Sequence, residues 1–207
     1  MNDPSTAGYR LRTATGRNMA TCLVLVSERK IKELKLPKIA IDVAYRTRPP
    51  YLGNHYDYEG HPAFAKADPA TQPGLVLAAA EVYRRAGVEP SDIQLAQVHD
   101  LSAFEGMESL EGMGIVPEGQ GGRFAMEGGT ALTGRCPTNT DGGALSYGHS
   151  SAGGDFGSKI HENWLQLTGK AGERQVKGAR IAAAQAYGSH HSMEVCSVMR
   201  NLEEARS

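Results

Sequence analysis

Residues that could do chemistry gather in three short stretches of this sequence. The first is Val98-His99-Asp100, the second runs from Asn139 to Gly154, and the third contains His190-His191. Histidine is the side chain suited to acid–base work near neutral pH, and closely spaced glycines let backbone N–H groups approach a ligand. Each stretch by itself also has an ordinary structural explanation as a hydrogen-bonded histidine, a turn or a solvated pair. Nothing beside the His190-His191 pair supplies a third ligand, so no metal is expected.

The elements around these stretches predict an α/β fold. The apolar run that includes Ile93 and Leu95 predicts a strand that brings His99 and Asp100 to its C-terminal end, where open α/β sheets bind ligands. Further strands are expected over 20–27, 38–46 and 193–200, and helices over 28–36, 74–87, 101–114 and 154–168, with 179–188 either helix or strand. Segment 114–148 is a glycine-rich connection. Alternating strands and helices favour a mixed sheet.

Composition excludes several classes of protein. The 207 residues are 40% hydrophobic and 22% charged, which suits a single folded α/β domain. Twenty-two basic and 23 acidic side chains provide no basic field, so no nucleic-acid partner is expected. No apolar run approaches the roughly 18 residues that span a bilayer, and no secretory leader is evident, so no membrane partner is expected. Three widely spaced cysteines indicate neither a disulfide framework nor a zinc knuckle, and the cytoplasm is the expected compartment.

Several motifs in the same order resemble the C-terminal half of the thiolase superfamily, in its sterol-carrier and lipid-transfer branch, which includes thiolase-like steroid side-chain aldolases. They are VHD at 98–100, PEG at 117–119, Gly134-Arg135 with Pro137, NxxGG at 139–143, Gly148-His149, QL and the following glycine at 166–169, and AGERQVKGA at 171–179. The resemblance implies a thiolase-like half-domain with a mixed five-stranded sheet and helices on both faces. It divides the chain into an N-terminal extension (1–19), a C-terminal thiolase-like domain (20–200, with a long loop insertion at 47–73) and a tail (201–207).

The resemblance also implies a chemistry and a set of site residues. Thiolases make or break a C–C bond beside a CoA thioester, using a cysteine nucleophile, an activating histidine and donors to the thioester oxygen. His149 takes the place of the activating histidine, His99 that of the group that polarises the carbonyl, and Tyr147 is the available acid. The residues expected to contact CoA or the acyl group are Asp100, Asn139, Gly142, Gly143, Gly148 and Ser150. No bound cofactor is expected, because the CoA thioester is the substrate.

Departures from the family pattern leave three interpretations open. The family's nucleophilic cysteine lies in the N-terminal half, Ser150 replaces the proline after the Gly-His step, and Cys196 falls in a predicted strand, where a buried role is expected. A partner chain could supply the cysteine, the partner being a thiolase N-terminal half or a homologous thiolase-like subunit. The site could instead run a retro-aldol cleavage without cysteine, with His149 and Tyr147 as base and acid. The third interpretation is a non-catalytic scaffold or acyl-CoA-binding subunit; a small OB-fold acyl-CoA-binding protein is a further possible partner.

Overall fold

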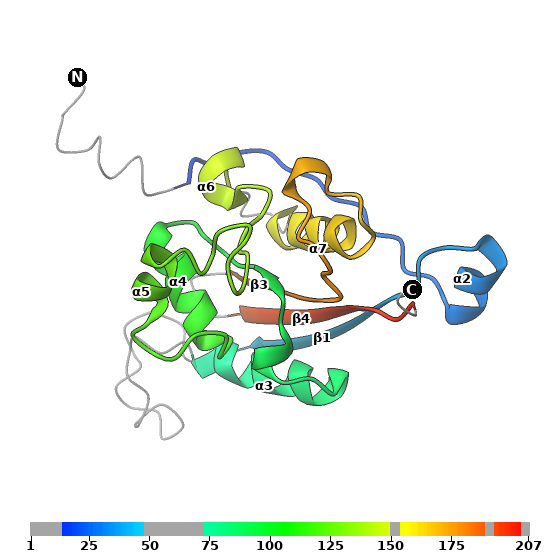
Figure 1. Ribbon diagram of the computed structural model, residues 1–207, viewed down its shortest axis with the longest axis horizontal. Coiled ribbons are helices and arrows are strands. Elements are labelled where there is room, and N and C mark those ends of the chain that lie inside the picture. The colour runs from blue at the N-terminus through cyan, green and yellow to red at the C-terminus, as the bar shows by residue number, and fades with distance from the viewer. Residues whose placement is uncertain (1–13, 48–72, 150–153, 189–192, 204–207) are drawn as a thin grey trace.

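A four-stranded mixed sheet forms the centre of the computed structural model, which describes residues 14–47, 73–149, 154–188 and 193–203 (Figure 1). The strands are β1 (Ile39–Thr47), β2 (Leu95–Gln97), β3 (Ile181–Gly188) and β4 (Met193–Asn201), in the spatial order β1-β4-β3-β2. β2 and β3 are parallel, and the other two pairs are antiparallel. The mixed α/β class expected from the sequence is therefore confirmed, with four strands where five were expected.

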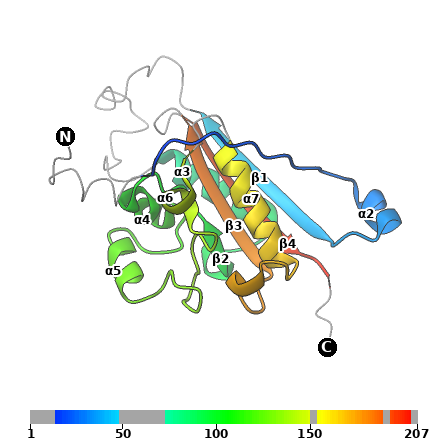
Figure 2. The ribbon, with the colours of Figure 1, turned by 90° about the horizontal axis from the view of Figure 1, so that it is seen from above.

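Helices cover both faces of the sheet, as predicted. α3 (Pro73–Ala86) packs on β1 and β4, and α7 (Gly154–Leu167) packs on the opposite face, mainly against β3 (Figures 1 and 2). β3 lies between these two layers, and its residues Ala182, Ala183 and Ala184 are fully buried. Small side chains on this strand let α7 approach the backbone closely, and because the strand is buried on both faces it appears in the sequence as an alanine run without alternation. This explains why helix and strand could not be distinguished at 179–188.

The remaining helices follow local sequence signals. They are α2 (Glu28–Leu34), α4 (Ala103–Gly112), α5 (Gly121–Met126) and α6 (Gly143–Tyr147), with short 3-10 turns at Pro90–Asp92 and Gly172–Arg174. Ser27 caps α2 by accepting a hydrogen bond from the Lys30 backbone N–H, as the sequence predicted. α5 and α6 both lie inside the segment that the sequence analysis interpreted as a glycine-rich connection. The sequence did not predict them, because helices of five or six residues leave no periodic pattern to detect.

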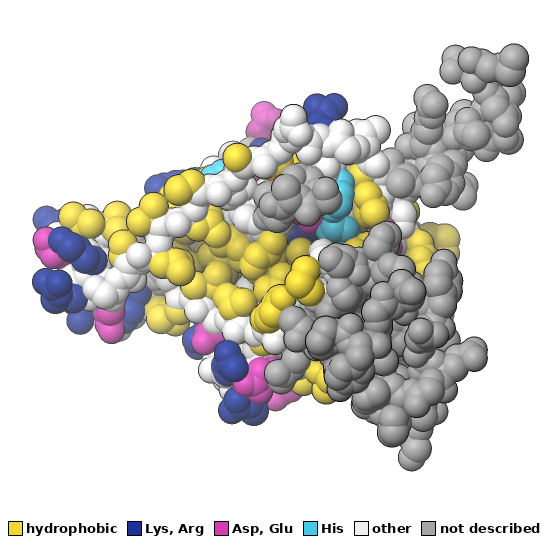
Figure 3. All heavy atoms as spheres, turned by 180° about the vertical axis from the view of Figure 1, so that it is seen from behind, with side chains coloured by type: hydrophobic (Ala, Val, Ile, Leu, Met, Phe, Trp, Pro, Cys, Tyr) yellow, Lys and Arg dark blue, Asp and Glu magenta, His cyan; other side chains and the backbone are white. Residues whose placement is uncertain are grey.

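The strand predicted at 20–27 does not form among the described residues. This segment is extended but pairs with no strand, and its apolar side chains Leu23, Val24, Leu25 and Val26 are exposed, Val24 and Leu25 to about 80%. Figure 3 shows hydrophobic side chains gathered between this segment and the edge strand β1, where Val43 and Tyr45 are also exposed. The run therefore has the composition of a strand, but no strand of the described chain pairs with it.

Three parts of the sequence interpretation lie outside the described residues: the loop insertion over 48–72, Ser150, and the His190-His191 pair. None of the helices in the described ranges is long and apolar enough to cross a membrane.

Candidate active site

His99 is the centre of the site, and three elements hold it in place. It follows β2, and only 1% of its surface is exposed. Its backbone N–H donates to the Gln185 side chain on β3 at 3.0 Å, and its carbonyl accepts from the Ser109 hydroxyl on α4 at 3.4 Å. A strand end that is buried and bonded on both sides leaves the imidazole ring little freedom to turn.

The His99 ring belongs to a buried charged cluster on the first turns of α7. His99 Nδ1 lies 2.9 Å from Asp155 Oδ2, and Asp155 Oδ1 accepts from Lys159 Nζ at 2.9 Å. All three side chains are at most 5% exposed. Burial raises the pKa of Asp155, but the hydrogen bonds and charges of His99 and Lys159 outweigh it and lower that pKa to about 2. A buried carboxylate at this position is tolerable only because it is paired in this way.

His149 lies beside His99, as the proposed chemistry requires. The two ring centroids are 4.9 Å apart, and the rings meet edge to face. His149 is half-buried, and its pKa is lowered first by burial and then by the charge of the neighbouring His99. The structure therefore brings together two histidines separated by fifty positions in the sequence.

The N-terminal extension fixes the backbone of His149. Its N–H donates to the Thr15 carbonyl at 2.8 Å, and its carbonyl accepts from the Arg17 N–H at 2.8 Å. Gly148, with φ of +95°, packs against Arg17 so closely that a Cβ there would lie 2.4 Å from the Arg17 side chain. Contact with this extension is therefore enough to require glycine at 148, even without any contact between Gly148 and a substrate.

The turn at 139–143 joins β2 to α6 through side chains that were predicted to bind substrate. Asn139 Oδ1 accepts from the Val98 N–H at 2.7 Å, and Asp100 accepts from the Ala144 N–H at 2.8 Å at the start of α6. Burial raises the pKa of Asp100, and the charge of Lys159 and the hydrogen bonds from the Ala144 and Leu145 N–H groups partly offset that increase. Both side chains therefore have structural partners, and contact with CoA remains a prediction for them, as it does for Gly142, Gly143, Gly148 and Ser150.

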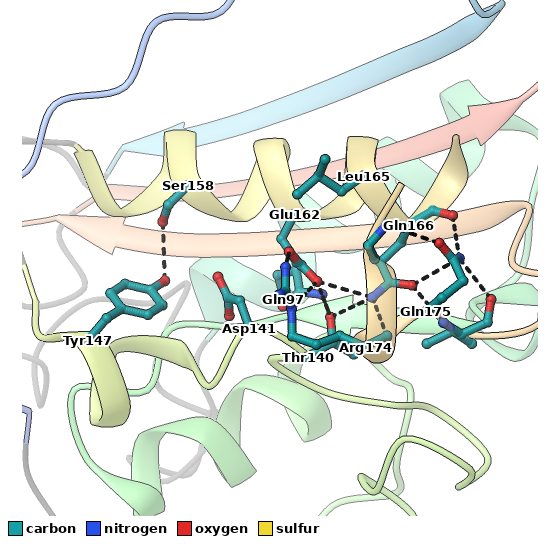
Figure 4. Close-up of polar contacts among 12 residues, drawn as sticks. Gln97, Thr140, Asp141, Tyr147, Ser158, Glu162, Leu165, Gln166, Arg174 and Gln175 are labelled. Atoms are coloured by element: carbon teal, nitrogen blue, oxygen red, sulfur yellow. Dashed lines mark hydrogen bonds and ion pairs between the residues drawn. The ribbon is translucent and has the colours of Figure 1, made fainter. Parts of the chain in front are cut away.

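A second polar network holds this turn against α7 (Figure 4). Glu162 is buried and accepts from the Thr140 hydroxyl at 2.8 Å and from the Arg174 guanidinium at 3.0 Å. Gln166 reaches the same Thr140 oxygen at 3.1 Å. Because Thr140 lies next to Asn139, the network fixes the turn that leads into α6 and His149.

Tyr147 hydrogen-bonds to a side chain of α7. Its hydroxyl lies 3.2 Å from Ser158 Oγ, and burial raises its pKa (Figure 4). A phenol with a raised pKa keeps its proton, which suits an acid, but the hydroxyl contacts Ser158. Its role as the catalytic acid stays a prediction.

Three functional candidates were missed at the level of sequence. Tyr187, at the end of β3, lies with its ring centroid 4.1 Å from that of His99, and its hydroxyl hydrogen-bonds Glu105 on α4. Burial, followed by the contact with Glu105, raises the pKa of Tyr187. Asp155 and Lys159 could have been found from the sequence, because two charged residues four positions apart on the apolar face of a helix imply a buried pair. Tyr187 could not, because its position depends on β2 and β3 being adjacent.

His99, His149 and Asp155 are also the described residues best placed to hold a metal ion. Each offers one ligand atom, and these atoms lie within 4.8 Å of one another. However, both Asp155 oxygens already accept hydrogen bonds, one of them from the Lys159 ammonium, whose positive charge opposes a cation. The arrangement suits proton transfer better than metal binding.

No cysteine of this chain is placed to act as the nucleophile. Cys136 and Cys196 are fully buried in the core cluster that α3 forms with the sheet, and burial raises their pKa values to about 11 and about 12. Cys22 is exposed in the extended segment. The buried role expected for Cys196 is confirmed.

The Asp155 pairing predicts a specific loss of stability in acid. Its pKa is depressed from 3.8 to about 2, so its contribution is complete above about pH 4 and disappears as the pH falls through about 2. In urea titrations, wild type should lose about 2 kcal/mol more unfolding free energy than the D155L/K159M variant between about pH 5 and pH 2. The matched control D42N/R200M removes an ion pair with a 2.8 Å contact that is about a quarter exposed, and it should lose nearly as much as wild type. Equal losses in wild type and D155L/K159M would contradict the assignment.

Comparisons with known proteins identify the family of this chain. The family model for thiolase C-terminal domain-like proteins matches residues 58–201. The acetyl-CoA acetyltransferase of Methanothermobacter thermautotrophicus is 36% identical over 55% of this chain and 29% of its own length, and sterol carrier protein 2 of Bos taurus is 34% identical over 62% and 23%. The benzoylsuccinyl-CoA thiolase subunit BbsB of Thauera aromatica is 29% identical over 63% of this chain and 31% of its own.

A solved structure, the Ltp2-ChsH2(DUF35) aldolase, shares the fold with a TM-score of 0.63 at 20% identity, covering 80% of this chain and 40% of that one. The chain spans less than a third of the length of the three curated relatives named above. With the motifs, the fold and the family match in agreement, the chain belongs to the thiolase C-terminal domain-like family.

Proposed function

We propose that this chain is a catalytic subunit of an acyl-CoA enzyme that makes or breaks a C–C bond beside a CoA thioester, with the nucleophilic cysteine supplied by a partner chain. The observation that carries the proposal is the pair of imidazoles, His99 and His149, 4.9 Å apart and backed by Asp155. One imidazole can take a proton while the other donates to the thioester oxygen as negative charge builds on it. A scaffold gains nothing from holding such a pair beside a buried carboxylate.

In thiolysis, one histidine takes the proton of the partner's thiol. The thiolate attacks the ketone carbon of a 3-ketoacyl-CoA, the Cα–Cβ bond breaks, and the electron pair leaves as the enolate of the CoA thioester fragment that retains Cα, which is then protonated. Free CoA next displaces the acyl group from the cysteine. The two buried cysteines of this chain, with their raised pKa values, are unsuited to this nucleophilic role.

Retro-aldol cleavage of a 3-hydroxyacyl-CoA is the second candidate. A base takes the proton of the β-hydroxyl group, the Cα–Cβ bond breaks to release an aldehyde or ketone, and an acid protonates the enolate of the shortened thioester. The favouring observation is that His99, His149 and the Tyr187–Glu105 pair form an acid–base cluster that needs no cysteine. Tyr147 is the alternative acid.

Substrate tests separate these reactions. The chain, purified with whatever partner accompanies it, is incubated with a 3-ketoacyl-CoA and free CoA, and separately with a 3-hydroxyacyl-CoA. Consumption of free thiol in the first assay means thiolysis, and release of an aldehyde or ketone in the second means retro-aldol cleavage. Binding of acyl-CoA without turnover in either assay would leave only the non-catalytic interpretation and overturn the proposal.

The exposed apolar surface supports a partner. Leu23 to Val26 and the neighbouring Val43 and Tyr45 of β1 expose apolar side chains on one face of the molecule (Figure 3). Such a surface marks an interaction site in soluble proteins. We infer that a thiolase-like half-domain covers it, in line with the subunit named among the relatives, and that a small OB-fold acyl-CoA-binding protein is the alternative partner.

Alkylation of cysteine tests where the nucleophile resides. Iodoacetamide should inactivate the assembled enzyme by labelling the partner, while in this chain Cys22 is modified and Cys136 and Cys196 are protected, because only Cys22 is exposed. Peptide mass spectrometry locates the label, and the C22S variant should be inactivated at the wild-type rate. Inactivation that follows labelling of Cys136 or Cys196 would exclude a cysteine supplied by the partner.

A further inference from the structure

The contact between Asp155 and His99 sets which nitrogen of the imidazole carries a proton. Asp155 Oδ2 lies 2.9 Å from His99 Nδ1, and the other oxygen accepts from Lys159 at 2.9 Å. An ionised carboxylate can only accept hydrogen bonds, so the ring nitrogen facing it must be the protonated one. Lys159, four residues further along α7 and equally buried, can only donate, and it keeps Asp155 in the ionised form.

The second nitrogen of His99 is left as a buried acceptor. Nε2 is shielded from solvent and has no hydrogen-bond partner within the described ranges. A neutral imidazole protonated at Nδ1 carries a lone pair at Nε2. Leaving a buried polar atom unpaired costs free energy, and such an atom in an active site is ready to receive a proton from a ligand.

The groups around His99 are compatible with this role. His149 faces it from the segment after α6, Tyr187 from β3, and Glu105 on α4 hydrogen-bonds the Tyr187 hydroxyl. The pKa of His149 is lowered by burial and by His99, so His149 is the imidazole more readily kept neutral when His99 gains a charge. Asp155 would then stabilise the His99 imidazolium directly.

We propose that Asp155 is a positioning residue that holds His99 in its Nδ1-protonated form and makes Nε2 the proton-accepting atom of the site. The proposal rests on the proposed function and reverses the roles expected from the sequence: His99 takes the proton, and His149 donates to the thioester oxygen. The proton leaves the substrate hydroxyl or the partner's thiol, binds Nε2, and later returns to the enolate carbon. The Nδ1 proton remains in the hydrogen bond to Asp155 throughout.

Nitrogen NMR on the full chain labelled with ¹⁵N-histidine tests this without any assay of activity. His99 is assigned by the signals that disappear in His99→Gln. At a pH where the ring is neutral, we expect the protonated-nitrogen signal from Nδ1 and the lone-pair signal from Nε2. A neutral His99 that carries its proton on Nε2 in the wild-type protein overturns the proposal.

Substitution of Asp155 provides the second test. In D155N the amide oxygen faces Lys159 and the amide N–H faces His99, so the proton should move to Nε2 and kcat should fall about a hundredfold or more with KM nearly unchanged. D155L/K159M, which leaves no buried charge unpaired, should likewise release His99 from the Nδ1-protonated form. The control D42N, which breaks a 2.8 Å contact with Arg200, should change neither the tautomer nor kcat.

Two outcomes separate the proposal from the proposed function. A fall in kcat without a change of tautomer means that Asp155 acts only through folding, and this overturns the positioning role. An Nδ1-protonated His99 that responds to D155N as expected, in a protein that turns over neither class of acyl-CoA, upholds the positioning role and removes only the catalytic assignment.

Discussion

Replacement of His149 by alanine should lower kcat of the assembled enzyme by at least about a hundredfold, because a positioned base or an oxyanion donor each contributes on that order. The half-buried ring lies 4.9 Å from His99, and its removal takes away one of the two imidazoles at the site. Steady-state kinetics with whichever class of acyl-CoA is turned over in the substrate tests measure the effect. Circular dichroism and thermal unfolding of the variant establish that the fold is retained.

Two further variants serve as a control and as a test of which role His149 has. His161→Ala removes an exposed histidine of α7 and should leave kcat unchanged. His149→Gln keeps a side-chain N–H donor but no titratable base. Partial activity in His149→Gln, above that of His149→Ala, indicates the donor role that follows from the Asp155–His99 pairing, whereas equal loss in both indicates the base role expected from the sequence. A near-normal rate in His149→Ala would remove His149 from the mechanism.

Gly143→Ala should cost about 2 to 5 kcal/mol of unfolding free energy, the sum of left-handed backbone strain and overpacking. Gly143 has φ of +63°, and a Cβ there would lie 2.2 Å from Asp100 Oδ2 and 2.7 Å from Asn139 Nδ2. The Asp100 carboxylate would have to move away from the Ala144 N–H that it caps. Denaturant unfolding followed by circular dichroism measures the loss.

Gly172→Ala is the matched control for this substitution. Gly172 has nearly the same φ, +62°, but a Cβ there would meet nothing within 4 Å. It should therefore cost only the backbone strain, about 1 to 2 kcal/mol. The difference between the two variants isolates the close approach of Asp100, and equal costs would show that Gly143 is needed for its backbone conformation alone.

Local chemistry made much of the fold predictable. The Ser27 cap and the Gly87 terminus bounded α2 and α3, and the apolar face of α7, with Ile160 and Leu167 buried, was evident from helical spacing. Such signals depend on neighbours within a few positions, so they can be recognised from the sequence alone. The segment 20–27 shows the limit of this reasoning. Its composition is that of a strand, but a strand also needs a partner, and composition carries no information about pairing.

By itself the sequence determined the family, the α/β layering and the presence of His99 and His149 at the ends of their motifs. The tertiary structure alone decided that His99 pairs with Asp155, fifty-six positions away, that Tyr187 packs beside it, and that the backbone at 15–17 supports His149. The physical reason is that a proton's location depends on which acceptor lies within about 3 Å of a ring nitrogen. That distance is set by the packing of α7 and β3 around the end of β2, which no motif spacing encodes.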